Sequence, residues 1–259
     1  MGDMLDIKHE NIAYWTHRTS SYSAINQEQL LDERGIAWLA ALVEPFRTAF
    51  PGKMPSELHV LDIGCGPGIF SILLARQGYR LTAVDYTPSM LEEARKNAGA
   101  LACDIQFVEA DAESLPFEDC SFDVVVSRNL TWNLPHPREA YAEWKRVLVS
   151  GGMLINFDAA WYRYLFDEAA GRAYEKDRHN AREAGMREEC EIPGFEKMEK
   201  IARQIPLSPV ERPAWDKQVL GELGMGVDID AGIWRMVWDA EEQVNFASTP
   251  LFRIVARKR

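Results

Sequence analysis

Val60-Leu61-Asp62-Ile63-Gly64-Cys65-Gly66-Pro67-Gly68 is the stretch of sequence that decides the fold. Its apolar start predicts a buried β-strand, and its closely spaced glycines predict a tight turn directly afterwards. A second apolar segment, Arg80-Leu81-Thr82-Ala83-Val84-Asp85, ends in an acid. A strand, a glycine turn, a helix and a strand with a terminal carboxylate form half of a nucleotide-binding fold, in which the acid accepts hydrogen bonds from ribose hydroxyls. The sequence therefore predicts a ligand that contains a nucleoside.

The spacing of the glycines differs from that of dinucleotide-binding proteins. Their fingerprint is G-x-G-x-x-G, whereas this run is Gly64-x-Gly66-x-Gly68 with a proline inside it. Asp62, at the end of the strand, would repel a pyrophosphate but attract an ammonium or sulfonium group. The pattern therefore favours a positively charged nucleoside.

Five motifs in the same order resemble class I S-adenosylmethionine-dependent methyltransferases. They are Asp62-Ile63-Gly64-Cys65-Gly66-Pro67-Gly68, the acid Asp85, the segment 110–117, the strand 121–127 and the helix and turn 146–152. The resemblance runs from about residue 58 to residue 157, and five ordered motifs are far more specific than one glycine loop. Within this class, the chain is similar to the small-molecule methyltransferases of menaquinone and ubiquinone biosynthesis.

The resemblance and the alternation of apolar and helical segments imply the same fold. We expect an α/β protein with a Rossmann-like, seven-stranded, mostly parallel sheet, helices on both faces and an antiparallel last strand. We divide the chain into an N-terminal helical cap (1–52), a cofactor-binding core (53–158), an inserted helical lid (159–215) and the C-terminal part of the core sheet (216–259). In the core, residues 69–77, a segment opening at Thr87 or Pro88, and 137–147 are expected to be helices.

The resemblance also assigns roles to residues at the carboxyl edge of the sheet. The glycine turn lets the methionine portion of the cofactor approach closely, and Asp62 lies near its ammonium group. Asp85 binds the ribose, Asp111 accepts the adenine amino group, and the two residues Tyr86 and Met90 flank the adenine ring. The full set of cofactor-binding residues that we infer is Tyr14, Arg18, Tyr22, Asp62, Gly64, Cys65, Gly66, Asp85, Tyr86, Met90, Asp111, Ala112, Glu113, Arg128 and Asn129.

Residues 6–50 are expected to be mostly helical, and the segment 14–22 is dense in aromatic and hydroxyl residues. In similar methyltransferases such a segment folds over the cofactor. We therefore expect Tyr14 and Tyr22 to cover the methionine end and Arg18 to meet its carboxylate. An aromatic staple that only holds the cap to the core explains the same residues.

The activity implied is methyl transfer from S-adenosyl-L-methionine to a small molecule by in-line displacement, which leaves S-adenosyl-L-homocysteine. A base is needed only if the nucleophile carries a proton. His136 is the candidate by position and by the near-neutral pKa usual for histidine, with Tyr14 and His17 as rivals from the cap. A polar turn residue between two prolines is the alternative reading of His136.

The segment 159–215 is longer than the compact fold requires, which suggests a lid over the acceptor. It opens with an aromatic cluster, residues 161–166, followed by a charged helical stretch, 167–191. Aromatic rings suit a planar or a cationic acceptor, although core packing also accounts for them. After the lid, 227–229 and 251–256 are expected to be paired strands at the sheet edge.

Composition narrows the classes of partner. The net charge of −11 argues against nucleic acid, whose phosphates require clustered Lys and Arg. No apolar run reaches the roughly 18 residues of a membrane helix, and no signal peptide precedes the cap, so a cytoplasmic location is expected. Four widely spaced cysteines predict reduced thiols and give no support to a metal site.

Two alternatives share the early motifs. A nucleotide-dependent oxidoreductase has the same strand, turn and acid, but the third glycine of its fingerprint is missing here. A non-catalytic S-adenosylmethionine-binding or regulatory protein fits every motif, because a fold does not fix a function. The sequence leaves open the methyl acceptor, the nucleophilic atom and the oligomeric state.

Overall fold

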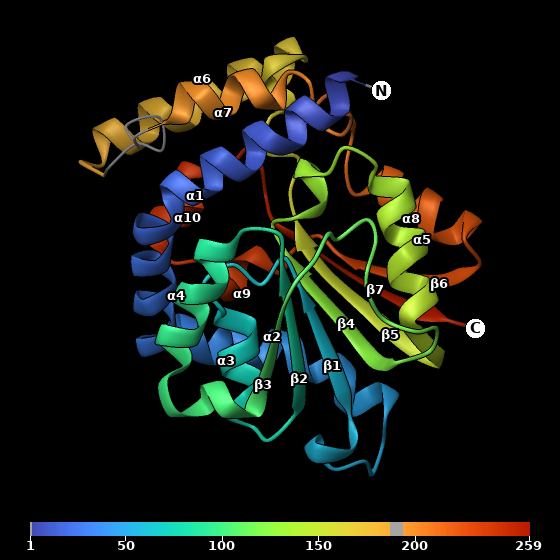
Figure 1. The fold of residues 1–259 in the computed structure, drawn as a ribbon. Helices are drawn as coiled ribbons and strands as arrows, with labels where there is room; N and C mark the ends of the chain where they lie inside the picture. Colours follow the sequence, from blue (N-terminus) through green and yellow to red (C-terminus); the bar gives the residue numbers. More distant parts are fainter. Residues whose placement is uncertain (1, 187–193) are drawn as a thin grey trace.

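Seven strands form one sheet at the centre of the protein (Figure 1). The computed structural model describes residues 2–186 and 194–259. The sheet order is β3-β2-β1-β4-β5-β7-β6. β7 pairs antiparallel with both β5 and β6, and every other pair is parallel. The strands are β1 (His59–Ile63), β2 (Arg80–Asp85), β3 (Ile105–Glu109), β4 (Phe122–Arg128), β5 (Leu148–Asp158), β6 (Met225–Asp230) and β7 (Phe252–Lys258). The predicted fold is confirmed, with β7 between β5 and β6 and with β6 at the edge.

Apolar residues on successive positions of β1 build a core on each face of the sheet. Val60 belongs to one buried cluster with Phe70 of α3 (Ile69–Ala75), whereas Leu61 belongs to another with Trp144 of α5 (Pro137–Val147). In register, Asp62 pairs with Ala83 of β2 on one side and with Val126 of β4 on the other. A strand buried on both faces explains the continuous apolar run in the sequence.

Helices cover both faces. The helices α2 (Glu33–Ala49), α3 and α4 (Pro88–Ala98) pack on one side, and α5 and α8 (Ala214–Glu222) lie against the other (Figure 1). Proline stands at the first position of α4 and α5, where a missing N–H costs nothing. The expected helix over residues 6–50 is divided at Asp32, whose side chain accepts a hydrogen bond from the backbone N–H of Arg34 and caps α2. The predicted helix at 69–77 ends two residues earlier, at Ala75.

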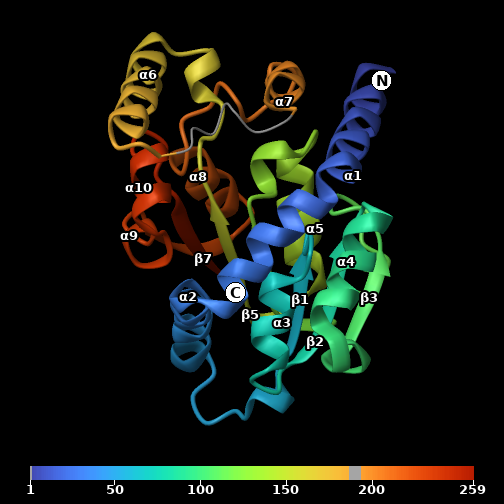
Figure 2. The same ribbon diagram turned by 90° about the vertical axis from the view of Figure 1, so that its left-hand side faces the viewer.

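Three helices lie beyond the carboxyl ends of the parallel strands (Figures 1 and 2). They are the N-terminal part of α1 (Gly2–Leu31), α6 (Glu168–Glu183) and α7 (Phe195–Ala202). α10 (Ala240–Asn245) packs against α6, and α9 (Trp234–Val237) packs against α2. The charged stretch predicted at 167–191 is helical to Glu183, and its end from residue 187, with Cys190, falls outside the described residues. The three described cysteines are free thiols. In the described part of the chain, every helix is too short or too polar to cross a membrane.

A buried ion network joins β5 to α8. The guanidinium of Arg212 bonds to Asp158 at 2.7 Å and to Asp216 through two nitrogens at 2.7 and 2.9 Å, and none of the three side chains is exposed. Asp216 also accepts the hydroxyl of Tyr141 at 2.6 Å, which connects the network to α5. Because charges in an apolar interior are tolerated only when they are paired, each group depends on the others.

Removing the cation of this network should destabilise the protein strongly. For Arg212→Leu we expect a loss of about 3 to 5 kcal/mol in the free energy of unfolding, because two carboxylates would remain buried and unpaired. Arg138→Leu breaks the ion pair with Glu222, in which both side chains are nearly half exposed, and should cost at most about 1 kcal/mol. Urea unfolding measures both. Equal losses would contradict a structural role for the buried network.

Candidate functional site

The glycine turn after β1 is held by the acid at the end of β2. Asp85 accepts hydrogen bonds from the backbone N–H of Gly66 at 2.9 Å and from that of Thr87 at 2.8 Å. Gly64, Gly66 and Gly68 all have positive φ, which disfavours any side chain. A Cβ on Gly64 would also lie 2.8 Å from Leu130. Burial holds the pKa of Asp85 above its ordinary value, although the hydrogen bonds that the carboxylate accepts partly offset this effect.

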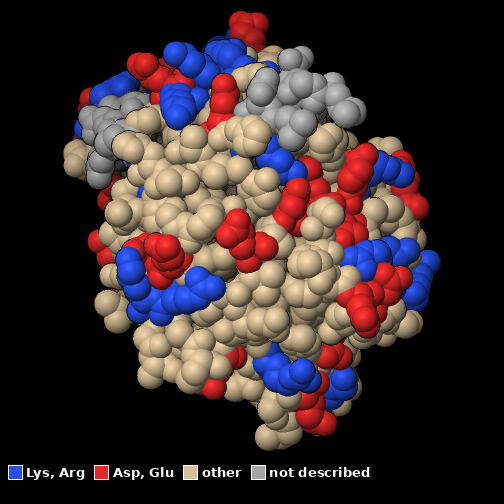
Figure 3. All heavy atoms as spheres, viewed as in Figure 1, with Lys and Arg blue, Asp and Glu red and all other residues tan. Residues whose placement is uncertain are grey.

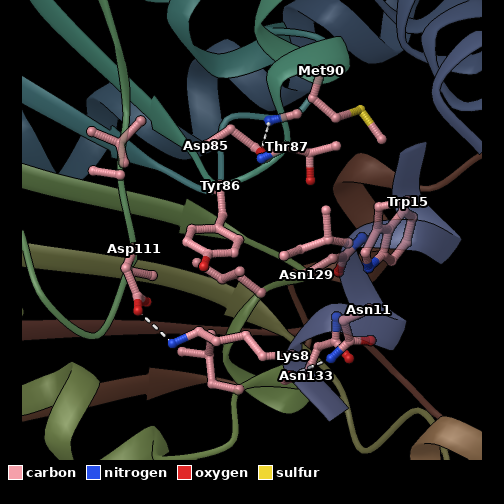
Figure 4. A pocket seen from close by; sticks show the side chains of 18 of the residues that line it. Lys8, Asn11, Trp15, Asp85, Tyr86, Thr87, Met90, Asp111, Asn129 and Asn133 are labelled. Carbon is pink, nitrogen blue, oxygen red and sulfur yellow. Dashed lines mark hydrogen bonds and ion pairs between the residues drawn. The ribbon is translucent and has the colours of Figure 1, made fainter. Parts of the chain in front are cut away.

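Next to this turn is a small cavity of about 130 Å³, which we call the Asp85 cavity (Figure 4). Ten of the predicted cofactor-binding residues line it, from α1, the glycine turn, the ends of β2 and β4 and the loop after β3. They are Tyr22, Gly64, Gly66, Asp85, Tyr86, Met90, Asp111, Ala112, Arg128 and Asn129. Sequence reasoning therefore selected residues that the fold brings to one place.

Other walls of the Asp85 cavity were not among the predicted site residues, although Trp15 belongs to the segment 14–22 that was expected to fold over the cofactor. Lys8, Asn11 and Trp15 come from α1, and Asn133 comes from the loop after β4 (Figure 4). The side-chain oxygens of Asn11, Asn129 and Asn133 are buried and accept no hydrogen bond. Buried polar atoms normally have partners, so three such oxygens around one cavity are suited to a ligand with several N–H or O–H groups.

Lys8 reaches across the cavity to the residue predicted to bind adenine. Its ammonium bonds to Asp111, lies 3.1 Å from Glu113 and is 5.6 Å from the centre of the Tyr86 ring. Burial lowers the pKa of Lys8, but the two carboxylates outweigh this effect and hold the pKa above its ordinary value. The ion pair therefore fixes the first turns of α1 over the carboxyl edge of the sheet.

A larger cavity of about 690 Å³ lies beside the first. We call it the aromatic chamber, because five of the eight tryptophans of the chain line it, namely Trp15, Trp38, Trp132, Trp161 and Trp238. Tyr14 and Arg18, predicted to cover the cofactor, line this chamber. The two cavities share Trp15, Tyr22, Arg128 and Asn129, so these four residues mark their junction.

The two residues at the end of β4 are unusual at this junction. Arg128 stacks on Trp38, with 4.6 Å from its guanidinium carbon to the ring centre, and donates one hydrogen bond to Gln29. Its Nη1 is buried and makes no hydrogen bond. Asn129 has a φ of 55°, a conformation costly for a residue other than glycine. An unpaired donor and an unpaired acceptor thus adjoin each other on consecutive residues.

The remaining predicted residues lie away from the cavity walls. Cys65 is buried inside the glycine turn, and Asp62 is buried beneath it, 2% exposed, where it accepts the backbone N–H of Ser71 at 3.0 Å and its hydroxyl at 2.6 Å. Burial raises the pKa of Asp62 to about 7, although the bonds from Ser71 lower it. Through these two hydrogen bonds, Asp62 holds the start of α3 against the glycine turn.

The candidate base His136 is on the outer side of the site. Its side chain is 49% exposed, and its backbone N–H and Nδ1 contact Glu113 at 2.6 and 3.1 Å. His17 is exposed on α1. Glu113 thus bridges Lys8 and His136, behind Asp111. Of the three candidates, Tyr14 alone lines one of the two cavities described above.

Comparison with known proteins gives sequence matches that cover the middle of the chain. A family described as "Methyltransferase domain" matches residues 61–156. A demethylmenaquinone methyltransferase from Deinococcus radiodurans is 39% identical over 102 residues, which cover 39% of this chain and 42% of that protein. A ubiquinone/menaquinone biosynthesis C-methyltransferase from Bartonella tribocorum is 39% identical over 122 residues, covering 43% of this chain and 47% of that protein. The chain therefore matches less than half the length of these curated relatives.

Solved structures are similar in fold over a larger part of this chain than the sequence matches cover. The geranyl diphosphate C-methyltransferase from Streptomyces coelicolor A3(2), in complex with S-adenosyl-L-homocysteine, superimposes with a TM-score of 0.55 and 13% identity over 85% of this chain and 77% of that one. Over residues 61–156 the chain is therefore similar to the methyltransferase class, and its fold is like that of a solved methyltransferase. Within that class, its sequence is similar to the methyltransferases of menaquinone and ubiquinone biosynthesis.

The raised pKa of Asp62 predicts a pH effect on stability. The folded value is about 7 against an ordinary value of 3.8, so the folded state binds this proton more tightly. Its stabilisation is complete below about pH 4 and is lost as the pH rises through about 7. Asp62→Asn should therefore show a smaller fall in the free energy of unfolding between about pH 5 and about pH 8. Asp104→Asn, at an exposed acid, is the control, and parallel wild-type and Asp62→Asn curves would refute the assignment.

Lys8 predicts an effect on cofactor binding. If Asp111 accepts the adenine amino group, the ammonium of Lys8 competes for the same carboxylate. Lys8→Met should then raise the affinity for S-adenosylhomocysteine about 1.5- to 5-fold, the range expected for removing a partly exposed ion pair. Lys53→Met removes the ion pair of Lys53 with Asp123 and should leave the affinity unchanged. Titration calorimetry measures the affinity of each variant for S-adenosylhomocysteine. A weaker affinity in Lys8→Met would contradict the competition and indicate that Lys8 contacts the ligand.

Proposed function

We propose that this protein transfers the methyl group of S-adenosylmethionine to a small-molecule acceptor. The observation that carries the proposal is the junction of the two cavities at Arg128 and Asn129. The nucleoside part of the cofactor is assigned to the Asp85 cavity, and the acceptor is assigned to the aromatic chamber. The methyl group then faces the chamber from the junction.

The unpaired atoms at the junction match the amino-acid end of the cofactor. Arg128 Nη1 is a donor for the methionine carboxylate, and Asn129 Oδ1 is an acceptor for its ammonium group. Arg18, one helical turn before Tyr22 on α1, is a second cation for the carboxylate. In the Asp85 cavity, Asp85 is assigned to the ribose hydroxyls and Asp111 to the adenine amino group.

The reaction needs little from the protein beyond placement. A lone pair on the acceptor forms the new bond to the methyl carbon, while the carbon–sulfur bond breaks and its electrons stay on sulfur. A proton leaves the acceptor atom only if that atom carried one. Holding the two reactants in line, in a cavity walled by aromatic side chains, supplies much of the rate. Where a base is needed, we assign it to Tyr14, because Tyr14 lines the chamber.

The distribution of charge on the surface also favours a small-molecule acceptor over nucleic acid. On the face seen in Figure 3, Lys and Arg side chains lie in small groups beside Asp and Glu. Nucleic-acid binding requires a basic face that follows the phosphates. The net charge of −11 points the same way.

Two ligands separate the roles at the junction. 5′-Methylthioadenosine has the nucleoside of S-adenosylhomocysteine but lacks the amino-acid group. Asn129→Gly retains the permitted backbone conformation and removes the carboxamide, so it should weaken S-adenosylhomocysteine binding about 10-fold and leave methylthioadenosine binding unchanged. Asp85→Asn should weaken both ligands. Calorimetry measures all four affinities, and equal losses for both ligands in Asn129→Gly would overturn the assignment.

The transfer itself is tested with methyl-labelled S-adenosylmethionine and the low-molecular-mass fraction of a cell extract. Label in small molecules, lost in Asp85→Asn, supports the proposal. Cofactor binding without any transfer would favour the non-catalytic alternative. Binding of NAD in place of S-adenosylhomocysteine would favour the oxidoreductase.

A further inference from the structure

The walls of the chamber are aromatic rather than aliphatic. Ten of its lining residues are Trp, Tyr or Phe, whereas Ile25, Met198 and Leu251 are the only large aliphatic ones among those described. A long aliphatic chain would be packed by Leu, Ile and Val. Flat rings instead offer faces that attract a planar group or a cation.

The charges of the chamber are divided between two regions. Arg128 and Arg18 lie at or next to the junction assigned to the cofactor, and Arg34 is paired with Asp32 at 2.7 Å and with Asp239 at 2.8 Å. Among the described residues, Glu28 and Glu241 line the chamber without an ion-pair partner. The charges left for the acceptor are therefore carboxylates.

Three rings meet at α10, the helix whose first turn carries the exposed Glu241. Trp161 lies 5.3 Å from Phe246 and 6.4 Å from Trp238, and Trp238 lies 5.5 Å from Phe246, between ring centres. Trp238 and Phe246 flank α10, which carries Glu241 in its first turn. The indole N–H of Trp161 donates to Asp158 of the buried ion network at 3.2 Å, so the orientation of that ring is fixed.

We propose that Trp161, Trp238, Phe246 and Glu241 form a subsite for a cationic group of the methyl acceptor. The inference rests on the proposed function, because it assigns the chamber to the acceptor. The acceptor is then a compact amine or ammonium compound, bound with its positive group against the three rings and with its nucleophilic atom toward the junction. Glu28, at the end of α1, adds a second negative charge to the chamber.

The test compares choline with 3,3-dimethylbutan-1-ol, which has the same shape without the charge. Both are titrated into the full chain saturated with S-adenosylhomocysteine, and quenching of tryptophan fluorescence reports occupancy. We expect choline to bind at least about 10-fold more tightly than the alcohol. Glu241→Gln and Phe246→Leu should each weaken choline binding about 3- to 10-fold. Glu139→Gln makes the same charge change at an exposed position of α5 and should leave choline binding unaltered.

Each other outcome has a defined meaning. Equal affinities for the two probes, tighter binding of benzoate than of choline, or no binding of choline would overturn the cationic subsite. S-adenosylhomocysteine affinity, measured in the same samples, separates this failure from that of the proposed function. If the cofactor product binds and choline does not, only the subsite is wrong. Unchanged S-adenosylhomocysteine binding in Phe246→Leu also shows that this variant is folded.

Discussion

The contact on which the site depends is the closure of the glycine turn onto Asp85. One carboxylate takes the N–H of Gly66 from the end of β1 and the N–H of Thr87 from the start of α4. The carboxylate thereby connects the segments that follow β1 and β2 at the wall of the Asp85 cavity. The backbone conformation of this turn requires glycine, so the geometry follows from residue size as much as from hydrogen bonding.

A second constraint ties the chamber to the core. Asp158, at the end of β5, accepts the N–H of Trp132 at 2.9 Å and the indole N–H of Trp161, while Arg212 holds its charge. Two walls of the chamber are therefore oriented by a carboxylate that is itself buried in an ion network. Such a network contributes little net stability compared with an apolar core of the same volume. It fixes the backbone of Trp132 and the indole ring of Trp161, whereas the indole N–H of Trp132 donates to the carbonyl of Asn129.

Most of the fold was predictable because its signals are local. Apolar strands, proline at the start of α4 and α5, and the ordered motifs together predicted the sheet and the residues along its carboxyl edge. Asp62 shows the limit of such reasoning: its position in the motif was right, but its side chain turns under the strand to Ser71 rather than to a cavity. His136 was chosen for its chemistry, and its exposure depends on Glu113, which no local pattern reveals.

The contribution of α1 was only half predicted. Tyr14, Arg18 and Tyr22 were inferred from the resemblance to similar methyltransferases. They are spaced four residues apart, and the same helical period continued upstream leads to Asn11 and Lys8. The ion pair of Lys8 with Asp111 joins residues 103 positions apart, so no sequence pattern indicated it. Asn133 likewise reaches the cavity through the path of the loop after β4. Long-range contacts of this kind arise from topology, which a single sequence does not display.

Because Trp15 and Tyr22 of α1 line both cavities, one helix borders the cavity that we assign to the cofactor and the chamber that we assign to the acceptor. A displacement of α1 large enough to exchange the cofactor also uncovers the chamber. An acceptor that received one methyl group would then leave before a fresh cofactor arrived. Successive methylations of the same molecule would be distributive, with the intermediate released between turnovers rather than retained. Partly methylated products would then accumulate whenever the acceptor is in excess.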